Sequence, residues 1–196
     1  MSGLRLHLNR LTQSKHIDKA LWWSLLFVWC GVLQANSLQS PEPPANAIAS
    51  AHPLATQAGI RILQQGGNAF DAAVTVSAVL AVVEPYSSGM GGGGFWLLHD
   101  AKQQKNIFVD AREKAPLNAH RDMYLDKAGK IIPKLSINGP MAAGIPGQAA
   151  AFVHLAKQYG KLPLSTTLKD AIKIANQGFA TDHHYAKLAN YRKDAL

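Results

Sequence analysis

The sequence is poor in cysteine and in charge. Its 196 residues include one cysteine, and charged side chains make up 16% of the chain. Cys30 lies in an apolar run near the N-terminus, so the chain can form no internal disulfide and must rely on its core. The preceding residue, Trp29, is too bulky for a lipoprotein cleavage site, which argues against lipidation. With 47% hydrophobic residues, the composition is typical of a globular domain.

A block of basic residues is also missing. The formal net charge is +8, but the lysines and arginines are scattered along the chain. Such a mildly basic surface gives no reason to expect nucleic-acid binding. The sequence has no G-x-S-x-G motif and no phosphate-binding loop with a Lys-Ser/Thr pair. Catalysis by a nucleophilic serine in a G-x-S-x-G turn and binding of a nucleotide are therefore not expected.

The histidines do not follow a metal-binding pattern. His183 and His184 are adjacent, so on a helix their side chains would diverge by about 100° and could not easily share a metal. His52 and His99 have no partner at ligand spacing. We expect no metal and no cofactor.

Residues 1–37 differ from the rest of the chain. A basic segment ends at Lys19, and residues 20–33 then run for 14 residues without a charge. That run is shorter than the roughly 20 residues of a membrane span and suits the apolar core of a secretory signal. Ala35 and Ser37 form a small-x-small cleavage site. We expect an exported protein, periplasmic or extracellular; the alternative is an uncleaved membrane anchor through residues 20–33.

The folded part is expected to begin after a linker. Residues 38–46 are rich in proline and predict that linker, which leaves residues 47–196 as one partial domain. A short strand is expected from Ala47, closed by Pro53. Apolar residues at helical spacing then predict a helix over residues 55–65, which Gly66 and Gly67 would end.

The next predicted element is an unusually apolar helix over residues 69–83. Asn68 can cap its N-terminus, Asp71 lies in its first turn near the positive end of the helix dipole, and Pro85 stops it. Almost every position is small or apolar, so this helix has no polar face to expose to solvent. It must be buried on most sides, which requires more layers of protein than one sheet and one helix layer.

The second half mixes strands and helices. Two strands, residues 94–100 and 106–116, are joined by a polar turn and predict an antiparallel hairpin. A loop-rich region and three further helices are expected, in order, over residues 128–140, 144–160, 166–178 and 182–196. On the helix after Thr166-Thr167, we expect Leu168, Ala171, Ile172 and Ala175 to share the buried face. This pattern predicts an α+β fold and argues against a regular doubly wound one.

Four consecutive glycines, Gly91 to Gly94, lie between the apolar helix and the hairpin. A dinucleotide-binding loop would have a strand before the glycines and a helix after them, and here the order is reversed. A tight connection explains some of the glycines. Close approach of another backbone, of a substrate or of a partner segment would explain the rest.

Four motifs in sequence order carry a family resemblance: "GGNAFDAAV", "VVEPYSSGMGGGGFWLLH", "DAREKAP" and "GIPGQAAAFVHLAKQYGKLPL". They resemble the large-subunit part of γ-glutamyltransferases, also called glutathione hydrolases, from about Ala47 to the C-terminus. The resemblance implies an N-terminal-nucleophile hydrolase with a four-layer αββα sandwich, incomplete in this chain. It also implies a precursor that cuts itself, and a threonine freed by that cut that attacks the γ-glutamyl amide.

The resemblance points to one substrate-binding residue in this chain. The arginine of the family's "REMAP"-like motif holds the α-carboxylate of the γ-glutamyl group, and it corresponds to Arg112 in "DAREKAP". A planar guanidinium offers a bidentate fit to a carboxylate. Without the motif, an ordinary strand-end ion pair with Asp110 or Glu113 would be the preferred interpretation. Glu113 belongs to the same motif, and a supporting role for it is a guess.

No catalytic residue is predicted within the 196 residues. We expect the nucleophilic threonine to lie beyond Leu196, because the paired threonines Thr166-Thr167 are interpreted as the N-cap of a helix. The chain alone is therefore expected to be inactive and marginally stable. The implied partners are the missing small subunit, glutathione and other γ-glutamyl compounds, and acceptor amino acids, dipeptides or water. The alternatives are a cephalosporin-acylase-like member of the superfamily or a non-catalytic remnant.

Overall fold

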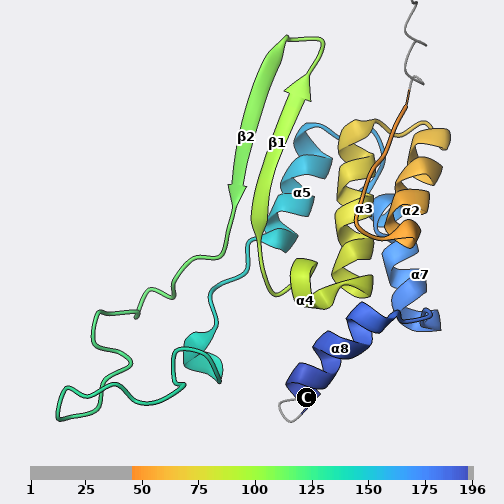
Figure 1. Cartoon of the computed structure of the whole chain (residues 1–196). Coiled ribbons are helices and arrows are strands. Elements are labelled where there is room, and N and C mark those ends of the chain that lie inside the picture. The colour runs from red at the N-terminus through yellow and green to blue at the C-terminus, as the bar shows by residue number, and fades with distance from the viewer. Residues whose placement is uncertain (1–45, 194–196) are drawn as a thin grey trace, which may run out of the picture. The chain divides into compact units, whose positions relative to one another are not determined.

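The computed structural model describes residues 46–193, which form one unit (Figure 1). The predicted signal or anchor at residues 1–37, and all but the last residue of the linker, lie outside the described residues. The elements in chain order are α2 (Pro53–Gln64), α3 (Ala69–Val83), α4 (Pro85–Ser88), β1 (Gly94–Asp100), β2 (Lys105–Ala111), the 3-10 helix η1 (Pro140–Ala142), α5 (Gln148–Gln158), α6 (Leu164–Thr167), α7 (Lys169–Gln177) and α8 (His183–Arg192). The mixture of helix and strand confirms the α+β prediction. None of the helices in this part of the chain is long and apolar enough to cross a membrane.

Helix α3 is the centre of the core, as its composition predicts. Asn68 caps it, and a capping box with Asp71 closes its first turn. Every residue of α3 except Ala69 is buried or half-buried. Helices α2, α5 and α7 surround it in Figure 1, and the most extensive of these contacts is with α2. There a Cβ at Gly59 would come within 2.6 Å of Val76.

The segment before α2 corrects one prediction. No strand forms over residues 47–53, because Pro53 is the first residue of α2 and not a stop. Proline suits a first helical turn, where its missing N–H has no partner to lose. The Nδ1 atom of His52 accepts the Leu54 N–H at 3.2 Å and so caps the helix. The extended segment instead packs the side chain of Ile48 against Gly59.

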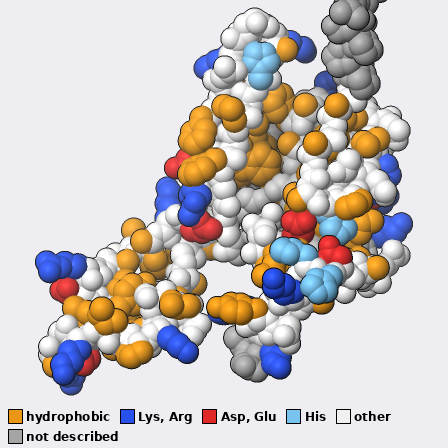
Figure 2. Space-filling model, in the orientation of Figure 1, with side chains coloured by type: hydrophobic (Ala, Val, Ile, Leu, Met, Phe, Trp, Pro, Cys, Tyr) orange, Lys and Arg blue, Asp and Glu red, His pale blue; other side chains and the backbone are white. Residues whose placement is uncertain are grey.

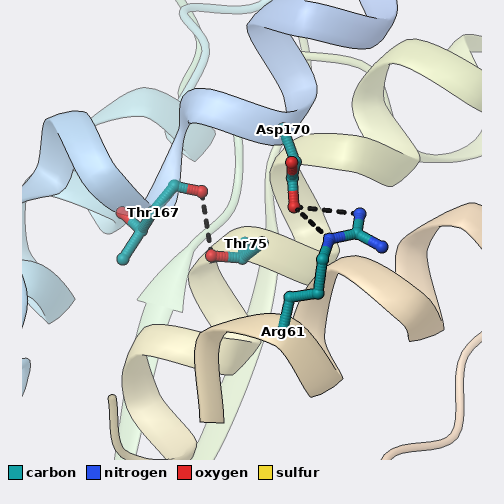
Figure 3. Close-up of polar contacts among 4 residues, drawn as sticks. All are labelled: Arg61, Thr75, Thr167 and Asp170. Carbon is teal, nitrogen blue, oxygen red and sulfur yellow. Dashed lines mark hydrogen bonds and ion pairs between the residues drawn. The ribbon is translucent and has the colours of Figure 1, made fainter. Parts of the chain in front are cut away.

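The paired threonines correct a second prediction. They end the short helix α6 and do not cap a helix, since α7 begins at Lys169 without a side-chain cap. Thr167 is fully buried, and its hydroxyl donates to the Leu164 carbonyl at 3.0 Å. Its own carbonyl accepts the Thr75 hydroxyl of α3 at 2.8 Å (Figure 3). The pair therefore ties α6 to the central helix.

The predicted apolar face of α7 is only partly right. Ala171 is buried, but Ile172 is 55% exposed and Ala175 is exposed as well, while Ile174 packs against the core. The side of α7 that faces the core is narrower than predicted: Leu168, Ala171 and Ile174 follow one another at three-residue spacing on it, and Ile172 and Ala175 lie at its solvent side. A further link to α2 is the ion pair between Arg61 and Asp170 at 3.0 Å, also shown in Figure 3.

The predicted antiparallel hairpin is confirmed, but its second strand is shorter than predicted: β2 ends at Ala111, and residues 112–116 lie outside it, with only an isolated bridge at Lys114. Strands β1 and β2 pair antiparallel from Gly94 opposite Ala111 to Asp100 opposite Lys105. One face of the hairpin packs on the helices, with the Trp96 ring edge-on to Phe152 of α5 at a centroid distance of 6.0 Å. The alternate side chains point away from the helices, as strand geometry requires.

A buried carboxylate joins the start of α3 to the turn after α5. Asp71 is 1% exposed, and its carboxylate accepts backbone N–H groups from Asn68 at 2.9 Å, Lys161 at 3.0 Å and Leu162 at 3.3 Å. A Cβ at Gly160 would come within 2.7 Å of the same carboxylate, so the turn needs glycine there. Two segments about 90 residues apart in sequence are thus held by one side chain.

Replacing this carboxylate by its amide tests that role. Asp71→Asn keeps the size but places an amide group among three N–H donors, so we expect the free energy of unfolding to fall by about 3 kcal/mol. Asp170→Asn is the matched control, because its ion pair with Arg61 is partly exposed and should cost about 1 kcal/mol or less. Urea denaturation followed by circular dichroism measures both; equal losses would contradict the assignment.

Candidate functional site

Arg112 immediately follows β2 and is largely exposed. Its Nε atom donates to the Glu113 carboxylate at 3.0 Å, and its backbone N–H donates to the Asp110 carboxylate, also at 3.0 Å. The guanidinium carbon lies 5.7 Å from the centroid of the Phe95 ring, within the range of a cation–π contact. The strand-end ion pair is therefore formed with Glu113, while Asp110 holds the backbone.

The Nη groups of Arg112 distinguish it from a fully paired arginine. Within residues 46–193, neither Nη group donates a hydrogen bond to the protein. Two parallel N–H donors on a fixed plane can bind a carboxylate in bidentate fashion. Arg112 can therefore hold a ligand carboxylate with its Nη groups while Glu113 orients the guanidinium through Nε.

Glu113 is held in its charged form. The hydrogen bond from its own backbone N–H lowers the pKa of its carboxyl below the ordinary value of 4.5; desolvation opposes this, and the Arg112 side chain and the Gly93 N–H add to the lowering. Because the pKa is depressed in the folded state, the ion pair is intact at neutral pH. It is lost only as the pH falls through that lowered pKa.

Two glycines enclose the backbone that carries Arg112. A Cβ at Gly93 would overlap the Ala111 carbonyl oxygen and lie 2.9 Å from Arg112 Cα. A Cβ at Gly147 would overlap the same oxygen and lie 2.8 Å from the Arg112 carbonyl oxygen. The Gly92 carbonyl joins the two sides, since it accepts the N–H groups of Gly147 and Gln148, both at 3.1 Å. We call Gly93 and Gly147 the glycine clamp.

The clamp explains part of the glycine run. The predicted close approach of another backbone is confirmed at Gly93, whereas a Cβ at Gly91 or Gly94 would meet open space. No sequence pattern points to Gly147 as the second half of the clamp. It was seen only as part of a turn before a helix, because the segment that it touches lies about 35 residues away in the chain.

A cavity of about 370 Å³ adjoins the clamp, between the end of β2, the turn at residues 145–147 and α5. Its lining includes Arg112, Lys114 and His154, with Asp110 as the one acid. This balance favours a ligand with an anionic group. A second cavity of about 230 Å³ lies beside the start of β1 and is lined by serines, glycines, Gln148 and the aromatic side chains of Phe95 and Trp96. Lys114, His154 and Gln148 are site residues that were not predicted from the sequence.

The other histidines have local partners. His99 bonds Asn106 across the hairpin at 2.8 Å, and the His184 ring packs edge-on to Tyr86 at 5.4 Å. Burial, together with Glu84, Asp182 and Tyr185, raises the pKa of the Tyr86 hydroxyl. In the part of the chain that the structure describes, no three His, Cys, Asp or Glu side chains are placed to hold a metal ion.

The described residues form a mixed helix–strand domain. At the end of β2, where Gly93 and Gly147 enclose the backbone, this domain presents Arg112 to solvent. Residues 55–196 match the family model described as Gamma-glutamyltranspeptidase, and the chain belongs to that family. Among curated relatives, the glutathione hydrolase proenzymes of Bacillus subtilis (strain 168) and Escherichia coli (strain K12) are 38% and 41% identical over 148 and 150 residues. These matches cover 74% and 76% of this chain but only 25% and 26% of the relatives.

Solved structures agree with this assignment. The Helicobacter pylori γ-glutamyltranspeptidase is 42% identical with a TM-score of 0.74, and the match covers 78% of this chain and 44% of that one. A cephalosporin acylase from Bacillus halodurans is 28% identical with a TM-score of 0.63, and the match covers 81% of this chain and 31% of that one. The chain thus spans about a quarter of the length of the curated relatives that it matches.

Replacing one glycine by alanine, which adds a single methyl group, tests the glycine clamp. Gly93→Ala or Gly147→Ala would push a Cβ into the Ala111 carbonyl, so we expect the free energy of unfolding to fall by about 3 kcal/mol. Gly91→Ala is the control in open space and should change it by less than about 0.5 kcal/mol. Chemical denaturation measures all three, and a Gly93→Ala variant as stable as Gly91→Ala would refute the clamp.

Proposed function

We propose that the chain is the N-terminal, large-subunit part of an exported γ-glutamyltransferase, or glutathione hydrolase. The complete enzyme would cleave γ-glutamyl amides such as glutathione and pass the γ-glutamyl group to water, an amino acid or a dipeptide. The family match and the glutathione hydrolase proenzymes among the relatives support this proposal. The observation that carries it is Arg112, with two Nη groups that no described residue engages.

In this proposal Arg112 holds the α-carboxylate of the γ-glutamyl group. Glu113 bonds Nε and leaves the Nη edge of the guanidinium facing the ligand. The Phe95 ring lies against the guanidinium, and the clamp prevents the backbone at Ala111 from shifting. A carboxylate bound in this way would fix the γ-amide at a set distance along the glutamyl chain, which is the positioning that acyl transfer requires.

The nucleophile is proposed to come from the part of the enzyme that this chain does not span. In this class of hydrolase an N-terminal threonine attacks, and its own α-amino group acts as the base. Thr167 does not fit that role, because it is fully buried and its hydroxyl is bonded to a backbone carbonyl. We therefore propose that the chain alone turns over no γ-glutamyl amide.

The proposal also concerns the fold of the complete enzyme and its location in or outside the cell. The described helices and the hairpin would contribute to a four-layer αββα sandwich, in which the partner supplies the remaining strands. Three side chains on the hairpin face away from the helices and are largely exposed, which supports a missing layer: Phe95, Leu97 and Phe108. Residues 1–37 would export the protein to the periplasm or the extracellular space, or residues 20–33 would anchor it in the membrane.

A cephalosporin acylase activity is the second candidate. The likeness to the Bacillus halodurans acylase favours it, since that match covers 81% of the chain. The Helicobacter pylori transpeptidase, however, has the higher identity and the higher TM-score. γ-Glutamyl transfer is therefore the first proposal.

Substitution of Arg112 tests the proposal. In the enzyme completed by its downstream sequence, Arg112→Ala should lower kcat/KM for a γ-glutamyl anilide by at least about 100-fold, which is the loss of a charge-assisted bidentate contact. Arg121→Ala is the matched control, because Arg121 is almost fully exposed in the same loop and pairs loosely with Asp122 at 3.6 Å. It should leave kcat/KM unchanged.

Three results would count against the proposal. Full activity in Arg112→Ala would remove Arg112 from the site. Turnover by the purified 196-residue chain would place a nucleophile within it. Hydrolysis of a cephalosporin amide in place of the γ-glutamyl anilide would favour the acylase.

A further inference from the structure

An aromatic pair lies beside the Arg112 guanidinium on the hairpin. The ring centroids of Phe95 in β1 and Phe108 in β2 are 5.4 Å apart, with an interplanar angle of 32°. The guanidinium carbon of Arg112 lies 5.7 Å from the centroid of the Phe95 ring. Both phenylalanines are largely exposed, at 60% and 61%, and Figure 2 shows hydrophobic side chains gathered along the hairpin. Phe95 thus joins a second ring to the cation outside the core of the described residues.

The register of the hairpin places these three side chains on one face. Phe95 lies opposite Asp110. Leu97 lies opposite Phe108, so the Phe108 ring is a diagonal neighbour of the Phe95 ring. Arg112 follows Asp110 by two residues, and alternate side chains of an extended chain point to the same side. The face of the hairpin that points away from the helices therefore carries the cation and both rings.

The Phe95 ring attracts the guanidinium without accepting hydrogen bonds from its Nη groups. The face of an aromatic ring carries negative charge density and attracts a cation that lies within about 6 Å. A carboxylate in the same place would accept N–H bonds and compete with a ligand for the Nη groups. Among the described residues, Glu113 is the one ion-pair partner of Arg112, and it bonds Nε. The ring therefore adds attraction while the Nη groups stay free.

We propose that Phe95 is a positioning residue of the candidate site and that Phe108 supports it. The Phe95 ring holds the guanidinium of Arg112, and its packing on Phe108 restricts the Phe95 side chain. An arginine that is restrained before its ligand arrives loses less rotamer freedom on binding. This inference rests on the proposed function, in which Arg112 binds the α-carboxylate of the γ-glutamyl group. It adds a residue that sets how tightly this carboxylate is held.

Loss of the contact between the ring and the guanidinium should change KM and leave kcat unchanged. Arg112 would hold the α-carboxylate both in the substrate complex and in the transition state. A substitution that weakens binding of both states equally raises KM without lowering kcat. A side chain that only stabilised the fold would instead set the amount of active enzyme and leave KM as it was. KM therefore separates positioning from a purely structural role.

Fluorination of the Phe95 ring tests the proposal in the enzyme completed by its downstream sequence. Fluorine withdraws electron density from the face of the ring and weakens its attraction for a cation, while the ring nearly keeps its size. We expect KM for a γ-glutamyl anilide to rise with each added fluorine, by about fivefold for the fully fluorinated ring, with kcat unchanged. The same series at Phe108 is the matched control, because that ring contacts Phe95 and not the guanidinium; it should leave KM unchanged.

Substitutions by natural residues extend the series. Phe95→Leu removes the ring and should raise KM at least about fivefold, whereas Phe95→Trp supplies the ring that binds cations best and should keep KM within about twofold. Leu97→Ala, two residues along on the same exposed face, should leave KM unchanged. Because Phe95 acts through Arg112, Phe95→Leu should not lower kcat/KM further in the Arg112→Ala enzyme.

The possible results separate this inference from the proposed function. A KM that does not follow the fluorine series, in an enzyme that needs Arg112, overturns the inference alone. An equal rise of KM in the Phe108 series, or an additional loss in the Arg112→Ala enzyme, overturns it as well. Full activity of Arg112→Ala, or no γ-glutamyl activity in the unsubstituted enzyme, contradicts the proposed function and the inference with it. Since fluorination keeps the shape of the ring, the fluorine series is decisive even where Phe95→Leu does not fold.

Discussion

Three backbone segments meet at the carbonyl group of Ala111, and the candidate site depends on how closely they approach. Gly93 leads into β1, Gly147 leads into α5, and the chain between Ala111 and Arg112 passes between them. A side chain at either glycine would overlap this carbonyl. The bonds from Gly147 and Gln148 to the Gly92 carbonyl hold the outer segments together at 3.1 Å. Arg112 is therefore placed by rigid backbone, while its own side chain remains largely exposed.

The helices hold the segments around the Ala111 carbonyl in place. The hairpin packs on α5, and the turn after α5 is bonded to the buried Asp71 carboxylate at the start of α3. Displacement of α5 would thus disturb both the Gly147 side of the clamp and the turn at Lys161. The opposite face and the outer edge of the hairpin carry exposed phenylalanine and leucine and lack such support. The difference between the packed and the exposed face of the hairpin is the reason why we propose that the domain functions only with a partner.

The sequence predicted the elements that depend on local patterns. The apolar run of α3, its Asn68 cap and the alternation of the hairpin were enough to place those elements. Proline was ambiguous: Pro53 could close a strand or open a helix, and the His52 cap that decides the matter is not a common N-cap. Thr167 was misjudged because its burial against α3 depends on tertiary packing. The four motifs identified Arg112, but its free Nη groups and the role of Gly147 depend on contacts between distant segments.

A structure of the complete enzyme with bound glutamate tests the central claim most directly. The account predicts that both Nη atoms of Arg112 lie about 3 Å from the two oxygens of the glutamate α-carboxylate, with Glu113 still on Nε. It also predicts that the Ala111 carbonyl remains between Gly93 and Gly147. A glutamate whose α-carboxylate is bound elsewhere, with Arg112 in contact with Glu113 alone, would contradict the account.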